Sequence, residues 1–147
     1  MEKNIGEDME EKFKEFFVST DYRWSENAAR MLSPLQLAYL GDAVYDLIIR
    51  SSLVAKKSLP VNDLHKEAVK HVNAQAQSKI LFLLEDKLTE NEWRIVKRGR
   101  NTKSATIPKN ANLSDYRYAT GLEALIGYLY ITGNTKRIFE LLNSVQV

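Results

Sequence analysis

The stretch "LAYLGDAVYDLIIR", residues 37–50, decides the fold class of this chain. Its apolar residues recur every three to four positions, which is typical of one face of an α-helix. Gly41 in the middle of such a helix costs about 1 kcal/mol relative to alanine. Asp42 is expected to be a buried carboxylate, which is unfavourable unless another group pairs with it. Gly41 removes side-chain bulk beside Asp42, so we expect another backbone or a ligand to approach closely there.

Helical periodicity continues through the rest of the 147 residues, and no convincing strand, repeat or domain linker interrupts it. The helix that contains Asp42 is predicted to begin after Ser33 and to end near Ala55. Asn62 and Ser114 are predicted to cap two later helices. The sequence therefore predicts an all-α, single-domain fold of about six helices.

Three further features complete this prediction. A capping box at residues 89–92 opens a helix that is predicted to end at Gly99. Residues 100–113 show no period and are predicted to form a long ordered loop. A short amphipathic helix is predicted around residues 13–17, near the N-terminus.

Composition excludes several classes of site. The chain has no cysteine, which rules out disulfides and thiolate metal sites and favours a reducing compartment. His65 and His71 lie six residues apart on one predicted helix, on different faces, so zinc is not expected. No apolar run approaches the roughly 20 residues that cross a bilayer, and the acid-rich N-terminus lacks a signal-peptide pattern. We expect a cytoplasmic protein with no membrane association.

The charge is distributed unevenly. The whole chain carries a net charge of +2, whereas residues 93–118 contain seven Lys or Arg residues against Asp115 alone, which gives +6. A local basic block in a nearly neutral protein indicates a surface that binds a polyanion. The alternative is a solvated loop, because charge runs are often only soluble surface.

Two acids stand in apolar helices, Asp42 and Glu123. They would be better tolerated if they shared a cation, and oxygen ligands favour a hard ion such as Mg²⁺ or Mn²⁺. Asp46, one turn from Asp42, could support such a site. The alternative is that each acid pairs with a base such as Arg50 or Arg117. Eighty-one residues separate the two acids, so only the fold decides whether they meet.

The motifs around these acids resemble a known family. "AYLGDAVYDL" and "EALIGYLY" resemble the two acidic motifs of ribonuclease III catalytic domains. The likeness extends over about residues 31–145 to Mini-III, a bacterial subfamily that consists of the catalytic domain alone. The matching motifs, in chain order, are YLGDA at 39–43, NDLHK at 62–66, KRGRNTKS at 97–104, PKN at 108–110, YRYAT at 116–120 and LEALIGY at 122–128.

This resemblance implies an all-helical, homodimeric endoribonuclease that cleaves double-stranded RNA with Mg²⁺, for which Mn²⁺ could substitute, and leaves 5′-phosphate and 3′-hydroxyl ends. It implies maturation of the ends of 23S ribosomal RNA precursor, with a ribosomal protein as a candidate partner. It implies that Asp42 and Glu123 are the catalytic and metal-binding carboxylates. Residues 1–30 would form an N-terminal helical extension and residues 31–147 the catalytic domain.

The same resemblance indicates that no separate double-stranded-RNA-binding domain is present, so the catalytic domain is expected to grip the duplex itself. Duplex RNA offers mainly phosphates and 2′-hydroxyls to a protein. The candidate RNA-binding residues, all from the basic block, are Lys97, Arg98, Arg100, Asn101, Lys103 and Lys109. Four aromatic residues, Tyr116, Tyr118, Tyr128 and Tyr130, are predicted to pack in the core or a dimer interface rather than to stack on bases.

The sequence also departs from the wider ribonuclease III family. Leu35, Ala38 and Thr120 stand where that family has acids, which leaves two carboxylates per site and the number of metal ions open. The helix of residues 37–50 is apolar nearly all round, so we expect a second chain to cover part of it. Two alternatives remain: a non-catalytic RNA-binding protein with a ribonuclease III fold, and a helical DNA-binding or protein-interaction domain.

Overall fold

The computed structural model describes residues 23–102 and 112–145, which form seven helices and no strand. The all-α prediction is therefore confirmed for this part of the chain. The helix predicted around residues 13–17 and residues 103–111 of the predicted loop lie outside it. The helices are α2 (Glu26–Arg30), α3 (Pro34–Lys56), α4 (Val61–Val72), α5 (Ala74–Leu83), α6 (Glu90–Asn101), α7 (Leu113–Ile131) and α8 (Thr135–Ser144).

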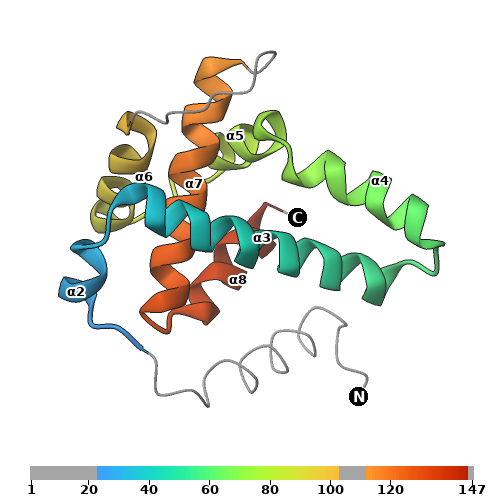
Figure 1. Cartoon of the computed structure of the whole chain (residues 1–147), viewed down its shortest axis with the longest axis horizontal. Coiled ribbons are helices and arrows are strands. Elements are labelled where there is room, and N and C mark those ends of the chain that lie inside the picture. Colours follow the sequence, from blue (N-terminus) through green and yellow to red (C-terminus); the bar gives the residue numbers. More distant parts are fainter. Residues whose placement is uncertain (1–22, 103–111, 146–147) are drawn as a thin grey trace.

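Helix α7 is the centre of the fold. It packs against α2, α3, α5, α6 and α8, and Figure 1 shows α3 crossing it, while α4 turns back from the end of α3 and leads to α5. Buried residues run along α7 on all sides: Ala119, Gly121, Leu122, Ala124, Leu125, Ile126, Gly127, Tyr128 and Leu129. A helix that is apolar all round has to be enclosed by other elements, and this requirement places α7 in the core.

Local hydrogen bonds explain where several helices begin. Thr89 and Glu92 form the predicted capping box at the start of α6. Ser33 caps α3 as predicted, and Gln36 completes a capping box there that was not predicted. The prediction of a cap at Ser114 is wrong, because the Asn112 side chain accepts from the backbone N–H of Asp115 and α7 begins at Leu113, two residues earlier than expected.

The expected cap at Asn62 is also wrong. Helix α4 begins at Val61, directly after Pro60, without a side-chain cap. Proline already holds φ near the helical value, so the turn can start there.

Gly99 does not end its helix, contrary to the prediction. Helix α6 continues to Asn101, and Thr102 follows it as the C-cap. A Cβ atom on Gly99 would lie 2.9 Å from the Cα of Gly121 in α7. This glycine therefore allows α6 and α7 to pack closely, which a sequence rule for helix ends does not anticipate.

An ion pair between Glu92 and Arg137 joins the start of α6 to α8. The Arg137 guanidinium donates to both carboxylate oxygens of Glu92, at 2.9 and 2.8 Å, and to the Lys87 carbonyl at 2.7 Å. Burial opposes ionisation of Glu92, but hydrogen bonds from Arg137 and from the Thr89 N–H outweigh it and hold the pKa of this carboxyl below its usual value. This ion pair holds the start of α6 against α8.

Candidate active site and nucleic-acid interface

The crossing of α3 and α7 is a contact between two glycines and the opposite backbones. A Cβ on Gly41 would overlap the carbonyl oxygen of Glu123 and lie 2.8 Å from the backbone nitrogen of Gly127. A Cβ on Gly127 would in turn overlap the carbonyl oxygen of Leu37. Because neither residue has a side chain, the helices touch at this point. The expected close approach beside Gly41 is therefore present, and the neighbouring backbone is that of Glu123.

This crossing brings Asp42 and Glu123 together across 81 residues of sequence. Burial, followed by a hydrogen bond with Asp42 and the negative charge of Asp42, raises the pKa of Glu123 to about 9. Glu123 is half-buried, whereas Asp42 is exposed in the single chain, so the expectation that Asp42 is buried is wrong. The site thus opens to solvent on the Asp42 side.

Neither carboxylate is neutralised by a base within residues 23–102 and 112–145. Arg50, one of the two expected partners, forms an ion pair of 3.0 Å with Asp46 instead. The Asp46 carboxylate is therefore already paired with Arg50. Arg117, the other expected partner, has no ion pair with Glu123 in this part of the chain. Two adjacent acids without a counter-charge favour binding of a cation.

The donor set restricts which cation would fit. The described residues contain no group of three or more His, Cys, Asp or Glu side chains that could hold a metal ion. Two carboxylates alone suit Mg²⁺ or Mn²⁺, because Mg²⁺ retains several water molecules and needs only one or two protein carboxylates. The residues therefore fit the ion that the sequence predicts.

Tyr45 is a residue of this region that sequence reasoning did not single out. Its side chain is fully buried, and its hydroxyl donates to the His71 carbonyl at 2.8 Å. Burial and then the charge of Glu123 raise the pKa of the Tyr45 hydroxyl. Tyr45 thus stays neutral and ties α3 to the end of α4 one turn beyond Asp42. Because Tyr45 stands in an apolar run, no sequence signal indicated that its hydroxyl would bind the end of α4.

The candidate RNA-binding residues have different surroundings. Lys97 is exposed on α6. Arg98 is also exposed, but it donates to the carbonyls of Arg30 and Leu32 at 3.1 and 3.4 Å, so it holds the connection between α2 and α3. Lys103 and Lys109 lie outside the described residues. An RNA phosphate would therefore have to compete with these two carbonyls for the N–H groups of Arg98. Among the described residues, Lys97 has no such competing partner.

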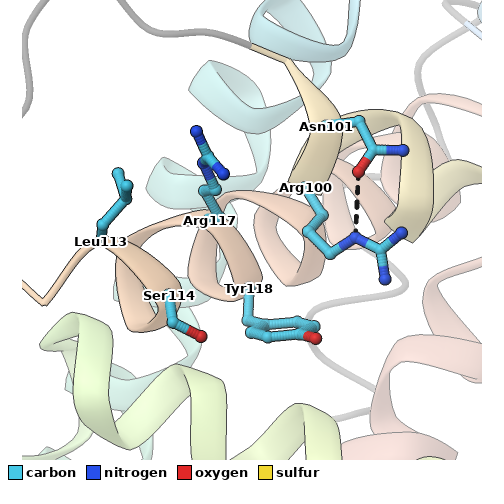
Figure 2. Close-up of a pocket in the computed structure, with 6 residues that line it drawn as sticks. All are labelled: Arg100, Asn101, Leu113, Ser114, Arg117 and Tyr118. Atoms are coloured by element: carbon cyan, nitrogen blue, oxygen red, sulfur yellow. Dashed lines mark hydrogen bonds between the residues drawn. The ribbon is translucent and has the colours of Figure 1, made fainter.

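Arg100 and Asn101 line a pocket between the end of α6 and the start of α7, which Figure 2 shows in close-up. The pocket has a volume of about 410 Å³. Its lining consists of Arg100, Asn101, Leu113, Ser114, Arg117 and Tyr118. Tyr118 is half-buried and packs against the core as predicted while also lining this pocket, and Tyr128 is buried as predicted. Arg117 and Ser114 are pocket residues that sequence reasoning did not assign to RNA.

No helix in residues 23–102 and 112–145 has the length and apolar content required to cross a lipid bilayer.

Comparison with known proteins gives consistent matches. The family model for the ribonuclease III domain matches residues 35–134. The Mini-ribonuclease 3 of Thermoanaerobacter sp. (strain X514) is 50% identical over 140 residues, which cover 95% of this chain and 98% of that protein. The Mini-ribonuclease 3 of Clostridium tetani is 41% identical over 133 residues, covering 90% and 87%. A crystal structure of a Fusobacterium nucleatum protein superposes with a TM-score of 0.72 at 35% identity, covering 79% and 93%.

Proposed function

This chain belongs to the ribonuclease III family and is an endoribonuclease, and on that premise we propose that it cleaves double-stranded RNA with a divalent cation held by Asp42 and Glu123. The observation that carries the proposal is the juxtaposition of these two carboxylates at the α3–α7 crossing with no base beside them among the described residues. The family gives the reaction class, and this juxtaposition supports the proposed site.

The two carboxylates have separate tasks. Asp42 is exposed and provides the side of the site that substrate can reach. Glu123 is half-buried and has to lose its proton before it can act as a ligand, because its pKa is raised to about 9 without a cation. When bound, Mg²⁺ would lower the pKa of a coordinated water and stabilise charge on the reacting phosphate. The products would carry 5′-phosphate and 3′-hydroxyl ends.

The active form is a homodimer through α3. Leu35, Tyr39 and Leu47 leave 38, 86 and 42% of their surface exposed in the single chain. At about 100° per residue these side chains share one side of α3, and Asp42 borders it. A row of exposed apolar side chains on a soluble protein is typical of a surface that another chain covers. A second copy with two-fold symmetry would place one site against each strand of a duplex.

The physiological substrate is the precursor of 23S ribosomal RNA, with a ribosomal protein as candidate partner and the cytoplasm as location. The support is the Mini-III motif series, since the relatives that share it are named Mini-ribonuclease 3. Lys97 is exposed, and Arg100 and Asn101 line a surface pocket, which supports the proposal that these residues contact the duplex backbone. Processing of a 23S precursor transcript, with the ends of the products mapped, tests this step separately from cleavage as such.

The central experiment is cleavage of a defined RNA duplex by the wild type, Asp42→Asn and Glu123→Gln, each with and without Mg²⁺. Asp46→Asn is a matched control, because Asp46 is a carboxylate on the same helix that is paired with Arg50. Wild type and the control should cleave only with the cation, and the two site variants should lose at least about a hundredfold in rate. Cleavage at the wild-type rate by either site variant at saturating Mg²⁺ would overturn the assignment.

A further inference from the structure

Two arginines from different helices line the pocket between α6 and α7 without an ionic partner. Arg100 and Arg117 form no ion pair in residues 23–102 and 112–145, and no carboxylate lines the pocket. By contrast, Arg94 on the same helix as Arg100 is paired with Glu90 at 3.3 Å. Two uncompensated guanidinium groups beside one pocket favour an anionic ligand.

We propose that this pocket binds the sugar–phosphate backbone of the RNA substrate, and that Arg117 is an RNA-contacting residue together with Arg100. The inference rests on the proposed function, since it names where the duplex is held. In Figure 2, Ser114 and Tyr118 project from one side of α7 and Arg117 from the other, while Arg100 extends from α6 toward Tyr118. The two arginines thus lie apart along the pocket, and we expect each to contact a different phosphate of one strand.

Arg100 is held in a conformation that leaves the N–H groups of its two terminal nitrogens available. Its guanidinium carbon lies 5.9 Å from the centre of the Tyr118 ring, and its Nε donates to Asn101 Oδ1 at 3.1 Å. The Tyr118 ring is itself fixed by Phe82, with ring centres 5.0 Å apart. Arginine has five N–H donors, so the four on its terminal nitrogens can meet a phosphate. This stack pre-organises the side chain and reduces the entropy lost on binding.

The remaining lining suits a ribose rather than an isolated anion. Ser114 and Asn101 provide a hydroxyl and an amide, groups that hydrogen-bond 2′-hydroxyls, and Leu113 provides an exposed apolar surface. Arg117 and Glu123 lie six residues apart on α7, or about 9 Å along its axis. The pocket therefore lies less than two helical turns along α7 from Glu123, and this continuity with the carboxylate pair favours RNA over an unrelated acidic peptide as the occupant.

The test is equilibrium binding of an RNA duplex, without divalent cations, as a function of salt. Each phosphate contact contributes about one unit to the slope of log K against log salt. Arg117→Ala should weaken binding about tenfold at moderate salt and reduce the slope by about one. Arg117→Lys should restore most of the slope because it keeps the charge, and Arg94→Ala is the matched control with no effect.

Cleavage and binding assays together distinguish a failure of the pocket assignment from a failure of the proposed function. In cleavage with Mg²⁺, Arg117→Ala should raise KM and leave kcat unchanged, because Arg117 does not touch the reacting phosphate. If the wild type binds the duplex but Arg117→Ala behaves like Arg94→Ala, the pocket assignment is wrong while the proposed function stands. If Arg117→Ala weakens binding but the wild type does not cleave the duplex, the pocket assignment stands while the proposed function is wrong.

Nuclear magnetic resonance of the wild type gives a check that needs no variant. The arginine Nε–H signals of Arg100 and Arg117 should shift on addition of the RNA duplex, and inorganic phosphate should shift them only weakly. Equal shifts with polyglutamate at the same charge concentration would identify an acidic peptide surface and overturn the RNA assignment.

Discussion

The raised pKa of Glu123 predicts that divalent cations bind more tightly as pH rises. With a pKa of about 9, roughly 1% of Glu123 is ionised at about pH 7, two units below the pKa. Each unit of pH then increases the ionised fraction about tenfold, and only that fraction can ligate a cation. Between about pH 6 and about pH 8 the apparent affinity for Mg²⁺ should therefore rise about a hundredfold, with close to one proton released for each ion bound.

Isothermal titration calorimetry in buffers of different ionisation enthalpy measures both quantities. Glu123→Gln should abolish the pH dependence together with most of the affinity, and Asp46→Asn should leave the dependence as in the wild type. A direct titration of the Glu123 carboxyl carbon by nuclear magnetic resonance, without cations, should give a midpoint near 9 that falls in Asp42→Asn. Burial, the largest cause of the shift, remains in that variant. An affinity that stays flat over this pH range would refute the reasoning.

The same shift fixes the sign of a stability change. The folded carboxyl keeps its proton to about pH 9, whereas an unfolded glutamate loses it near its usual value of 4.5. Between these values the folded state binds more protons, so the free energy of unfolding should fall as pH rises in the absence of cations. Glu123→Gln should remove this part of the pH dependence in urea denaturation, and its persistence in that variant would contradict the pKa assignment.

Three further substitutions test the packing of the helices and the proposed dimer interface. Gly41→Ala should cost about 3 kcal/mol or more in urea denaturation, because its Cβ would overlap the backbone of Glu123; a cost near zero would contradict the observed crossing. Arg137→Leu should cost about 3 kcal/mol, because it leaves the buried carboxylate of Glu92 unpaired, and recovery in the double variant with Glu92→Leu distinguishes this cause from lost packing. Tyr39→Glu should convert the proposed dimer to a monomer in light scattering without loss of helicity, and a retained dimer would exclude α3 as the interface.

Helix boundaries show what the sequence could and could not predict. Ser33 and Thr89 were predictable, because each is followed three residues later by the Gln or Glu that completes a capping box. Ser114 was not, because Asn112 is an equally good cap two residues earlier and the sequence does not say which one the chain uses. Gly99 was misread because a glycine that ends a helix and one that admits a neighbouring helix look the same in sequence.

The candidate site has a similar limit. The residue types of Asp42 and Glu123 indicated a shared cation, but their meeting depends on Gly41 and Gly127 facing the opposite backbones, which is a property of the packed helices. The exposure of Asp42 was also unpredictable, because apolar neighbours in sequence do not reveal which side of a helix is left open. In the sequence, the family resemblance with its ordered motifs is the signal that assigns both acids to one site.

Helix α7 connects these features in one rigid element. Its middle is enclosed by α3, α5 and α6, and glycine contacts fix its position against two of them, at Gly127 with α3 and at Gly121 with α6. Arg117 lies on α7 before the Gly121 contact, and Glu123 lies between the two glycine contacts. Because both residues belong to this one fixed helix, the distance between the pocket and the carboxylate pair is constant. A catalytic domain that grips its own substrate needs this constancy, since a duplex held at Arg117 is useful only if the phosphate to be cleaved is then held at Asp42 and Glu123. The close-packed glycines are thus as important to the proposed reaction as the charged side chains.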